Sequence, residues 1–252
     1  MDVSNRIVEG FLRAVFPEAC PVCGTGCDGP GPCGRHRLKP SDDKSRCGRC
    51  AAELPRGIPD GQRCAACARR SLRLGTVLTL GDYSERSPLR DWVLALKHGG
   101  RRGLAQPLGV ELARRWRARF PEAESPLLVP VPLHFLRRIE RGYDQAHLLA
   151  THLAAEANGT LCRALRRQRW TAPQGSALES REANVSGAFQ LRTKHITQLK
   201  GRLVWLVDDV LTSGATLRAC ARVLRKGGAR QVSALVLARA VRGKEPLDRV
   251  GG

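Results

Sequence analysis

The stretch LVWLVDDVLTSGATL, residues 203–217, decides the fold that we expect for this chain. Its five apolar residues at 203–207 predict a strand that is buried on both faces, as strands of parallel sheets are. A helical period over 215–226 ends at two glycines, which favour a helix stop. The apolar run at 232–238 predicts the next parallel strand. The order strand, turn, helix, strand predicts an α/β fold with a mainly parallel sheet.

Two carboxylates, Asp208 and Asp209, follow the predicted strand, and a turn of small polar residues comes next. Open α/β sheets bind their ligands beyond the carboxyl ends of the strands. A helix N-terminus presents free N–H groups and the positive end of the helix dipole, which suits a phosphate. The hydroxyls of Thr212, Ser213 and Thr216 add donors, whereas the acids suit sugar hydroxyls or hydrated Mg²⁺. A phosphorylated ribose matches both halves of this chemistry.

At these residues the chain resembles the type I phosphoribosyltransferases, in which apolar residues, two acids and a T/S-G-x-T loop bind phosphoribosyl pyrophosphate (PRPP). The resemblance implies that Asp208 and Asp209 contact the ribose and Mg²⁺ and take part in catalysis. The PRPP-binding set that it implies also contains Thr212, Ser213, Gly214, Ala215 and Thr216. One alternative is a Walker B strand, but the chain has no G-x-x-x-x-G-K-[ST] sequence to accompany it. The other is an ordinary strand–turn–helix with a capping hydroxyl.

Three arginines lie in the loop at 133–142, which follows a predicted strand at 127–131. In a PRPP reaction the pyrophosphate leaves from C1 of the ribose, so cations must absorb its developing charge. We expect Arg137, Arg138 and Arg141 to supply that charge, and we favour Arg141 because it begins the sequence RGYDQ. Lys97 is a further candidate. For Arg137 and Arg138 the alternative is a solvated loop charge.

Strand and helix patterns alternate over the rest of the chain after residue 75. We expect a strand at 76–80, helices at 88–97 and 104–120, and a helix at 145–157 with Asp144 as N-cap and Gly159 as its end. The polar segment 166–187 has few apolar anchors and predicts a lid over the site. Its candidate residues are Gln174, Arg181 and Asn184.

Eight of the ten cysteines precede residue 70, and six of them form C-x-x-C pairs. Two such pairs supply four thiolates for a tetrahedral Zn²⁺, so we expect a structural zinc module. The predicted ligands are Cys20, Cys23, Cys47, Cys50, Cys64 and Cys67. Six paired thiols are more than one four-ligand site needs and fewer than two such sites need. Either one pair is unused or Cys27 and Cys33 complete a second site, and residues 28–46 otherwise have the composition of a mobile insertion.

The formal net charge of +20 and the pI of about 10.7 indicate a polyanionic partner, with nucleic acid the leading candidate and a basic solvated surface the alternative. No apolar run is long enough to span a membrane. The first 20 residues predict a short amphipathic helix that stops near Pro17, and they lack the features of a signal peptide. We therefore expect a cytoplasmic protein.

Three blocks of the chain resemble the ComF family: FPEACPVCG at 16–24, VPVPLHFLRRIERGYDQAHLLATHLA at 129–154 and LRRQRWTAPQGSALESREANVSGAF at 165–189. The motif at 203–217 is a fourth. Tyr143 and Asp144 stand where the family usually has Phe and Asn. The resemblance covers nearly the whole chain except the insertion after Cys23.

This resemblance implies an N-terminal double zinc ribbon at 1–74 and a phosphoribosyltransferase-like domain at 75–252. It further implies a role in DNA uptake during natural competence, with incoming single-stranded DNA and a DNA-uptake helicase as partners. The alternatives are an active Mg²⁺-dependent phosphoribosyltransferase of nucleotide metabolism and a PRPP-sensing regulator. No residue identifies itself as a general base, so the sequence leaves open whether catalysis occurs.

Overall fold

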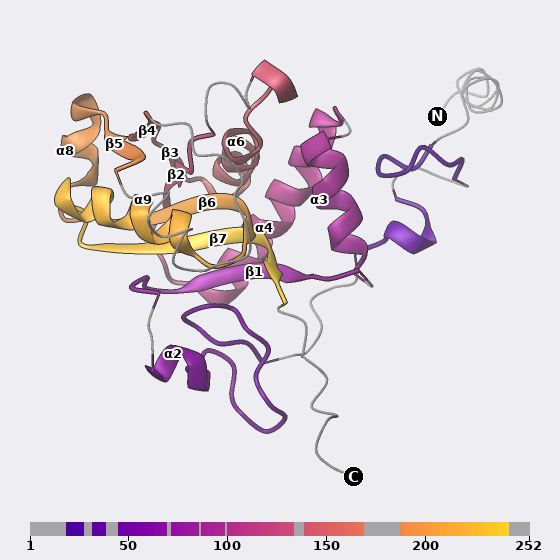
Figure 1. Cartoon of the computed structure of the whole chain (residues 1–252), viewed down its shortest axis with the longest axis horizontal. Helices are drawn as coiled ribbons and strands as arrows, with labels where there is room; N and C mark the ends of the chain where they lie inside the picture. The colour runs from indigo at the N-terminus through magenta and orange to yellow at the C-terminus, as the bar shows by residue number, and fades with distance from the viewer. Residues whose placement is uncertain are drawn as a thin grey trace, which may run out of the picture.

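The computed structural model of this chain describes residues 19–27, 32–38, 45–69, 72–85, 87–98, 100–133, 139–168 and 187–241. Its centre is a five-stranded sheet in the order β1-β7-β6-β2-β3, and every neighbouring pair is parallel (Figure 1). The strands are β1 (Val77–Tyr83), β2 (Leu127–Pro130), β3 (Thr160–Leu161), β6 (Leu203–Leu211) and β7 (Gln231–Ala240). The predicted α/β fold with a mainly parallel sheet is confirmed.

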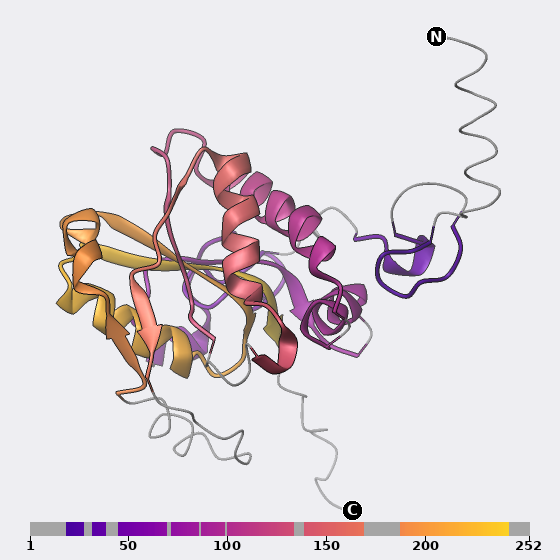
Figure 2. The same ribbon diagram turned by 90° about the horizontal axis from the view of Figure 1, so that it is seen from above.

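Helices cover both faces of this sheet (Figure 2). One face carries α3 (Pro88–His98), α4 (Ala105–Arg119) and α6 (Gln145–Ala157), and the other carries α9 (Ala215–Lys226). The central strand β6 shows why both layers form. Trp205 and Val207 pack with the first group of helices, whereas the alternate residues Val204 and Leu206 pack with α9.

Smaller elements extend the α9 side of the sheet. Strands β4 (Leu165–Arg167) and β5 (Phe189–Leu191) form an antiparallel pair, and α8 (Ile196–Leu199) follows. Leu165, Phe189 and Leu199 are buried in the same apolar cluster as α9. The remaining short helices are η1 (Gly34–His36), α2 (Ala65–Arg69), η2 (Arg102–Leu104) and η3 (Thr193–His195).

Two helices have the bounds that the sequence predicts, 145–157 and 215–226. The Asp144 side chain accepts a hydrogen bond from the His147 N–H at 3.1 Å, so its predicted role as N-cap is confirmed. The predicted stop at Gly159 is one residue late, because Asn158 adopts the left-handed conformation (φ 50°) that ends α6.

The expected helix before Pro17 lies outside the described residues, as does most of the expected lid segment. In the part of the chain that the structure describes, no helix combines the length and the apolar character needed to cross a bilayer.

Candidate functional site

The acid pair lies within β6 rather than after it. The strand was predicted to end at residue 207, but it continues to Leu211, because Asp208 and Val210 pair with Val236 and Ala238 of β7. Since side chains of a strand alternate, Asp208 belongs to the face covered by α9 and Asp209 to the face covered by α3. The acid pair therefore reaches both helical layers at the carboxyl half of the sheet.

Asp209 forms an ion pair with Lys97, which lies in the last turn of α3. The Lys97 Nζ is 2.9 Å from the Asp209 Oδ1, and both side chains are largely buried. A charge-assisted contact of this length fixes the lysine beside the acids. The structure thus brings Lys97 to the predicted site, although Lys97 and the acid pair are more than a hundred positions apart in the chain.

Asp208 is the more perturbed carboxyl of the pair. Burial and the negative charge of Asp209 raise its pKa to about 8, although the Asp209 N–H donates to Asp208 Oδ1 and Lys97 is close. The charge of Asp144 adds a smaller effect in the same direction. A cation bound beside Asp208 would favour the ionised carboxylate and would offset this effect. The donor set of the acid pair accordingly fits Mg²⁺.

The predicted phosphate cradle is the turn between β6 and α9. Gly214 has φ 75°, and a Cβ at this position would lie 2.6 Å from Leu72 Cδ2, so the turn requires glycine. The Ser213 Oγ accepts from the Ala215 N–H at 3.4 Å, and Arg218 Nη1 donates to the Ser213 carbonyl at 2.9 Å. The other N–H groups of the first turn of α9 have no acceptor within the helix.

The sequence RGYDQ at 141–145 connects this site to α3. The Tyr143 hydroxyl donates to the Leu96 carbonyl, next to Lys97, and Arg102 lies 5.2 Å from the centre of the Tyr143 ring. Arg141 Nη1 donates to the Gln145 side chain at 3.3 Å, and no described contact joins it to the acid pair. The loop therefore positions the end of α3. Arg137, Arg138, Gln174, Arg181 and Asn184 lie outside the described residues.

Two groups of metal-ligating side chains occur in the described N-terminal residues. The first joins Cys20, Cys23, Cys33 and His36; the second joins Cys47, Cys50, Cys64 and Cys67. In each group the four ligand atoms lie within 4.8 Å of one another. Tetrahedral Zn²⁺ with Zn–S bonds of about 2.3 Å needs sulfur atoms about 3.8 Å apart, and the Cys50–Cys64 distance is 3.7 Å. Both groups therefore could hold zinc.

The two groups use the same local backbone. In one, Cys20 N donates to Thr25 O while Gly24 N donates to Cys20 O. In the other, Cys47 N donates to Ala52 O while Ala51 N donates to Cys47 O. Gly24 (φ 79°) and Ala51 (φ 56°) hold the same left-handed position. The repeat indicates two equivalent metal-binding turns.

His36 is a candidate ligand that the C-x-x-C pattern does not contain. Its Nδ1 lies 3.2 Å from Cys33 Sγ and 3.6 Å from Cys20 Sγ, while its Nε2 lies 3.1 Å from Asp91 Oδ2 of α3. A carboxylate on the far nitrogen is the usual partner of a metal-bound imidazole. The expectation that residues 28–46 are only a mobile insertion is therefore wrong for 32–38. The spacing Cys33-x-x-His36 was the available signal.

The thiol pKa values reflect how closely the ligands are packed. Burial disfavours the thiolate of Cys20, but backbone N–H donors outweigh it and lower the pKa to about 6. The same balance lowers the pKa of Cys47 to about 7. Burial raises the pKa of Cys50 to about 11, and burial and the neighbouring Cys50 raise the pKa of Cys67. The first cysteine of each group is thus the thiolate that could receive a cation.

Comparison with known proteins supports this description. The family model "Phosphoribosyl transferase domain" matches residues 109–250. Competence protein F of Haemophilus influenzae is 32% identical over 203 residues, which cover 77% of this chain and 84% of that protein. The chain belongs to the ComF family. The family resemblance seen in the sequence is confirmed.

Further relatives of this ComF-family chain carry related names. The DNA utilization protein YhgH of Escherichia coli K12 is 29% identical over 212 residues, covering 78% of this chain and 85% of its own. Competence protein ComFC of Bacillus subtilis is 37% identical over 114 residues, covering 45% of this chain and 44% of its own. The ComF-family chain therefore combines a phosphoribosyltransferase-like domain with Cys-rich groups compatible with a zinc ribbon.

Proposed function

We propose that this protein binds PRPP and Mg²⁺ at the carboxyl half of β6 and handles incoming single-stranded DNA in the cytoplasm during natural transformation. The observation that carries the first part is the arrangement of the acid pair, its lysine and the glycine turn. Asp208 and Asp209 would receive the ribose hydroxyls, and the first turn of α9 would receive the 5′-phosphate. PRPP carries both of these groups on one ribose.

The chain's own cations would hold the pyrophosphate. Arg141, and with it Arg137 and Arg138 of the same loop sequence, would supply positive charge to the pyrophosphate, and the lid segment with Gln174, Arg181 and Asn184 would exclude water. Asp208 and Asp209 would hold Mg²⁺, which when bound would supply positive charge against the negative charge that develops on the leaving pyrophosphate. Lys97, already beside Asp209, would orient that carboxylate.

The DNA part rests on charge and on relatives. The net charge of +20 is far above what solubility requires, and relatives are named for competence and DNA utilization. Binding should be salt-dependent, because Lys and Arg release counterions from the phosphates. A DNA-uptake helicase is the proposed protein partner.

The zinc groups would serve as structural centres of an N-terminal module, residues 1–74, joined to the phosphoribosyltransferase-like domain, residues 75–252. Contacts between the modules include His36–Asp91, the Trp92 Nε1 to His36 carbonyl bond at 2.7 Å, and the Val77 N–H to Gly48 carbonyl bond at 3.0 Å. The metals would thus stabilise the frame that carries α3 and Lys97.

Calorimetric titration of PRPP with Mg²⁺ tests the proposal. We expect binding that Asp209→Asn weakens at least tenfold, because a charge-assisted contact is worth about 1.5–3 kcal/mol. Glu111→Gln, a change of a half-buried, ion-paired carboxylate on α4, is the matched control. Equal PRPP affinity of the two variants would refute the site. Pyrophosphate release, measured with and without DNA and nucleobases, separates the binding protein from the active transferase.

A further inference from the structure

A cavity of about 690 Å³ lies between the second metal-binding turn and the outer edge of the sheet. Its walls come from residues 45–49 and 60–63, from residues 75–79 leading into β1, and from the end of α4. It contacts Gln231, the first residue of β7, and therefore lies toward the amino ends of the strands. The acid pair and the cradle lie in the carboxyl half of the same sheet, so this cavity is separate from the proposed PRPP site.

Arginine dominates the charged lining of the cavity. The side chains that line it include five arginines and one carboxylate, that of Asp60. The arginines are Arg46, Arg49, Arg63, Arg115 and Arg119. Their positive charges outnumber the negative charge of Asp60 even when the formal dianion of a zinc–tetrathiolate centre at Cys47 is added to it. The charges therefore do more than compensate the metal site.

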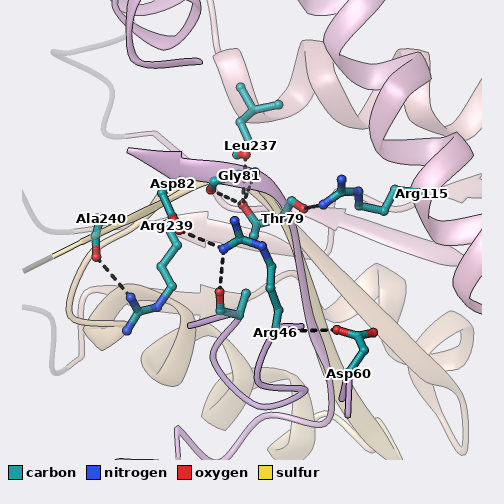
Figure 3. A network of polar contacts seen from close by, with 10 residues as sticks. Arg46, Asp60, Thr79, Gly81, Asp82, Arg115, Leu237, Arg239 and Ala240 are labelled. Atoms are coloured by element: carbon teal, nitrogen blue, oxygen red, sulfur yellow. Dashed lines mark hydrogen bonds and ion pairs between the residues drawn. The ribbon is translucent and has the colours of Figure 1, made fainter. Parts of the chain in front are cut away.

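Three of these guanidinium groups are held in place by the protein, and Figure 3 shows two of them, Arg46 and Arg115. Arg46 Nη1 lies 2.8 Å from Asp82 Oδ1 and 3.1 Å from the Ala51 carbonyl. Arg115 donates to the Thr79 carbonyl on the outer edge of β1. Arg49 donates to the carbonyls of residues 74 and 75. Because a guanidinium has five N–H donors, contacts of this kind orient a side chain and leave it able to bind an anion.

The other two arginines are exposed and come from different segments of the lining, the second metal-binding group and α4. Arg63 lies between the two halves of the second metal group, and Arg119 ends α4. Arg119 Nε is 3.8 Å from Asp60 Oδ2, longer than a hydrogen bond, and its side chain is 48% exposed. The cavity therefore has exposed cations beside arginines that are hydrogen-bonded to the protein.

The lining also offers apolar surface beside the charges. Leu78 and Ala118 provide it, and the almost fully buried Ala51 and Val77 lie beside them in the lining. A volume of this size accommodates a small organic ligand, for which pockets of about 300–1,000 Å³ are usual. A ligand with a planar apolar part and a phosphate matches such a lining. Inorganic phosphate would leave most of the cavity unfilled.

We propose that this cavity binds a nucleotide, with its phosphate toward the arginines and its base on the apolar lining. The nucleotide can be a free nucleoside 5′-phosphate or one residue of a nucleic acid, since both present the same groups. The site goes beyond the proposed PRPP function, because it uses none of the residues of the acid pair, the cradle or the RGYDQ loop.

The test compares two double variants of the full, zinc-loaded chain. Arg63→Gln/Arg119→Gln removes one exposed cation from each wall, and Arg56→Gln/Arg114→Gln removes one exposed arginine from the same ribbon and the same helix outside the cavity. Calorimetry at about 150 mM salt, near physiological ionic strength, measures binding of dTMP, the other three deoxynucleoside monophosphates, an unphosphorylated (dT)8 and inorganic pyrophosphate. Circular dichroism and zinc content establish that both variants are folded.

We expect nucleotide or oligonucleotide affinity to fall at least tenfold in Arg63→Gln/Arg119→Gln and less than twofold in the control, because a guanidinium binds a phosphate through charge-assisted hydrogen bonds. Binding of monophosphates identifies the free nucleotide as ligand, and binding of (dT)8 alone identifies a nucleic acid residue. Asp209→Asn should leave this binding intact, which separates it from failure of the PRPP site. Equal loss in both double variants, binding of pyrophosphate as tight as that of nucleotides, or no binding by any probe would overturn the proposal.

Discussion

Replacing Asp208 with asparagine should stabilise the ligand-free protein, and the gain should increase with pH. The raised pKa of Asp208, about 8 against an ordinary value of 3.8, means that the folded chain keeps a proton which the unfolded chain releases above pH 4. The free energy of unfolding of the parent protein should therefore fall as pH rises from about 4 to about 8 and then level off. The amide of Asp208→Asn would be neutral throughout and would remove this dependence.

The size of the effect follows from the size of the pKa change. One pKa unit corresponds to about 1.4 kcal/mol, so that value is also the limiting slope per pH unit. Between pH 6 and pH 8 the advantage of Asp208→Asn should grow by roughly 2–3 kcal/mol. For a chain of this length that corresponds to a melting temperature difference that grows by roughly 5–10 °C.

Thermal unfolding of the zinc-loaded protein, without PRPP or Mg²⁺, measures this difference at half-unit steps from about pH 6 to pH 8.5, the range in which the parent carboxyl titrates. Glu156→Gln, which removes an exposed carboxylate from α6, is the control for the loss of one negative charge. Because both proteins carry the same thiols, zinc loss at low pH cancels in the comparison. A difference between Asp208→Asn and parent that stays constant from pH 6 to pH 8 would refute the assigned burial and charge environment of Asp208.

Three further predictions use the same site and the metal groups. Metal analysis should find two zinc ions per chain, and His36→Asn should lower the value to about one, because three thiolates alone leave a tetrahedral site incomplete. Asp144→Asn keeps an N-cap acceptor for the His147 N–H but removes a charge that raises the pKa of Asp208, so PRPP affinity at pH 6.5 should increase with unchanged melting temperature. Thr216→Val should weaken PRPP binding roughly tenfold or more in calorimetry, whereas Thr151→Val on α6 should not change it.

The sequence predicts the fold well where the signal is local. The apolar runs and helical periods of 203–226 and 145–157 were sufficient, because a parallel sheet covered by helices requires those patterns. The predicted end of β6 at residue 207 was wrong, because the run of apolar residues stops at Asp208. The strand itself continues, because its backbone pairs with β7 regardless of which side chains it carries.

The candidate site was only partly predictable. Asp208, Asp209 and the glycine turn are consecutive, so a motif contains them. The Lys97–Asp209 ion pair and the His36–Asp91 contact join distant segments, and no periodicity reports such contacts. The pKa of Asp208 likewise depends on burial and on Asp144, which only the folded arrangement brings near.

The covered edge of β1 determines how the protein would aggregate after metal loss. One border of the sheet is the two-residue strand β3, too short to recruit another chain, but β1 is seven residues long. Two of its outward groups are occupied: the Val77 N–H by the Gly48 carbonyl, which lies in the second metal-binding turn, and the Thr79 carbonyl by Arg115. Stripping the metal from that turn would release Gly48 and open a strand edge of the kind that pairs between molecules. Aggregation would then follow directly from metal loss, and chelators would act on this protein as precipitants.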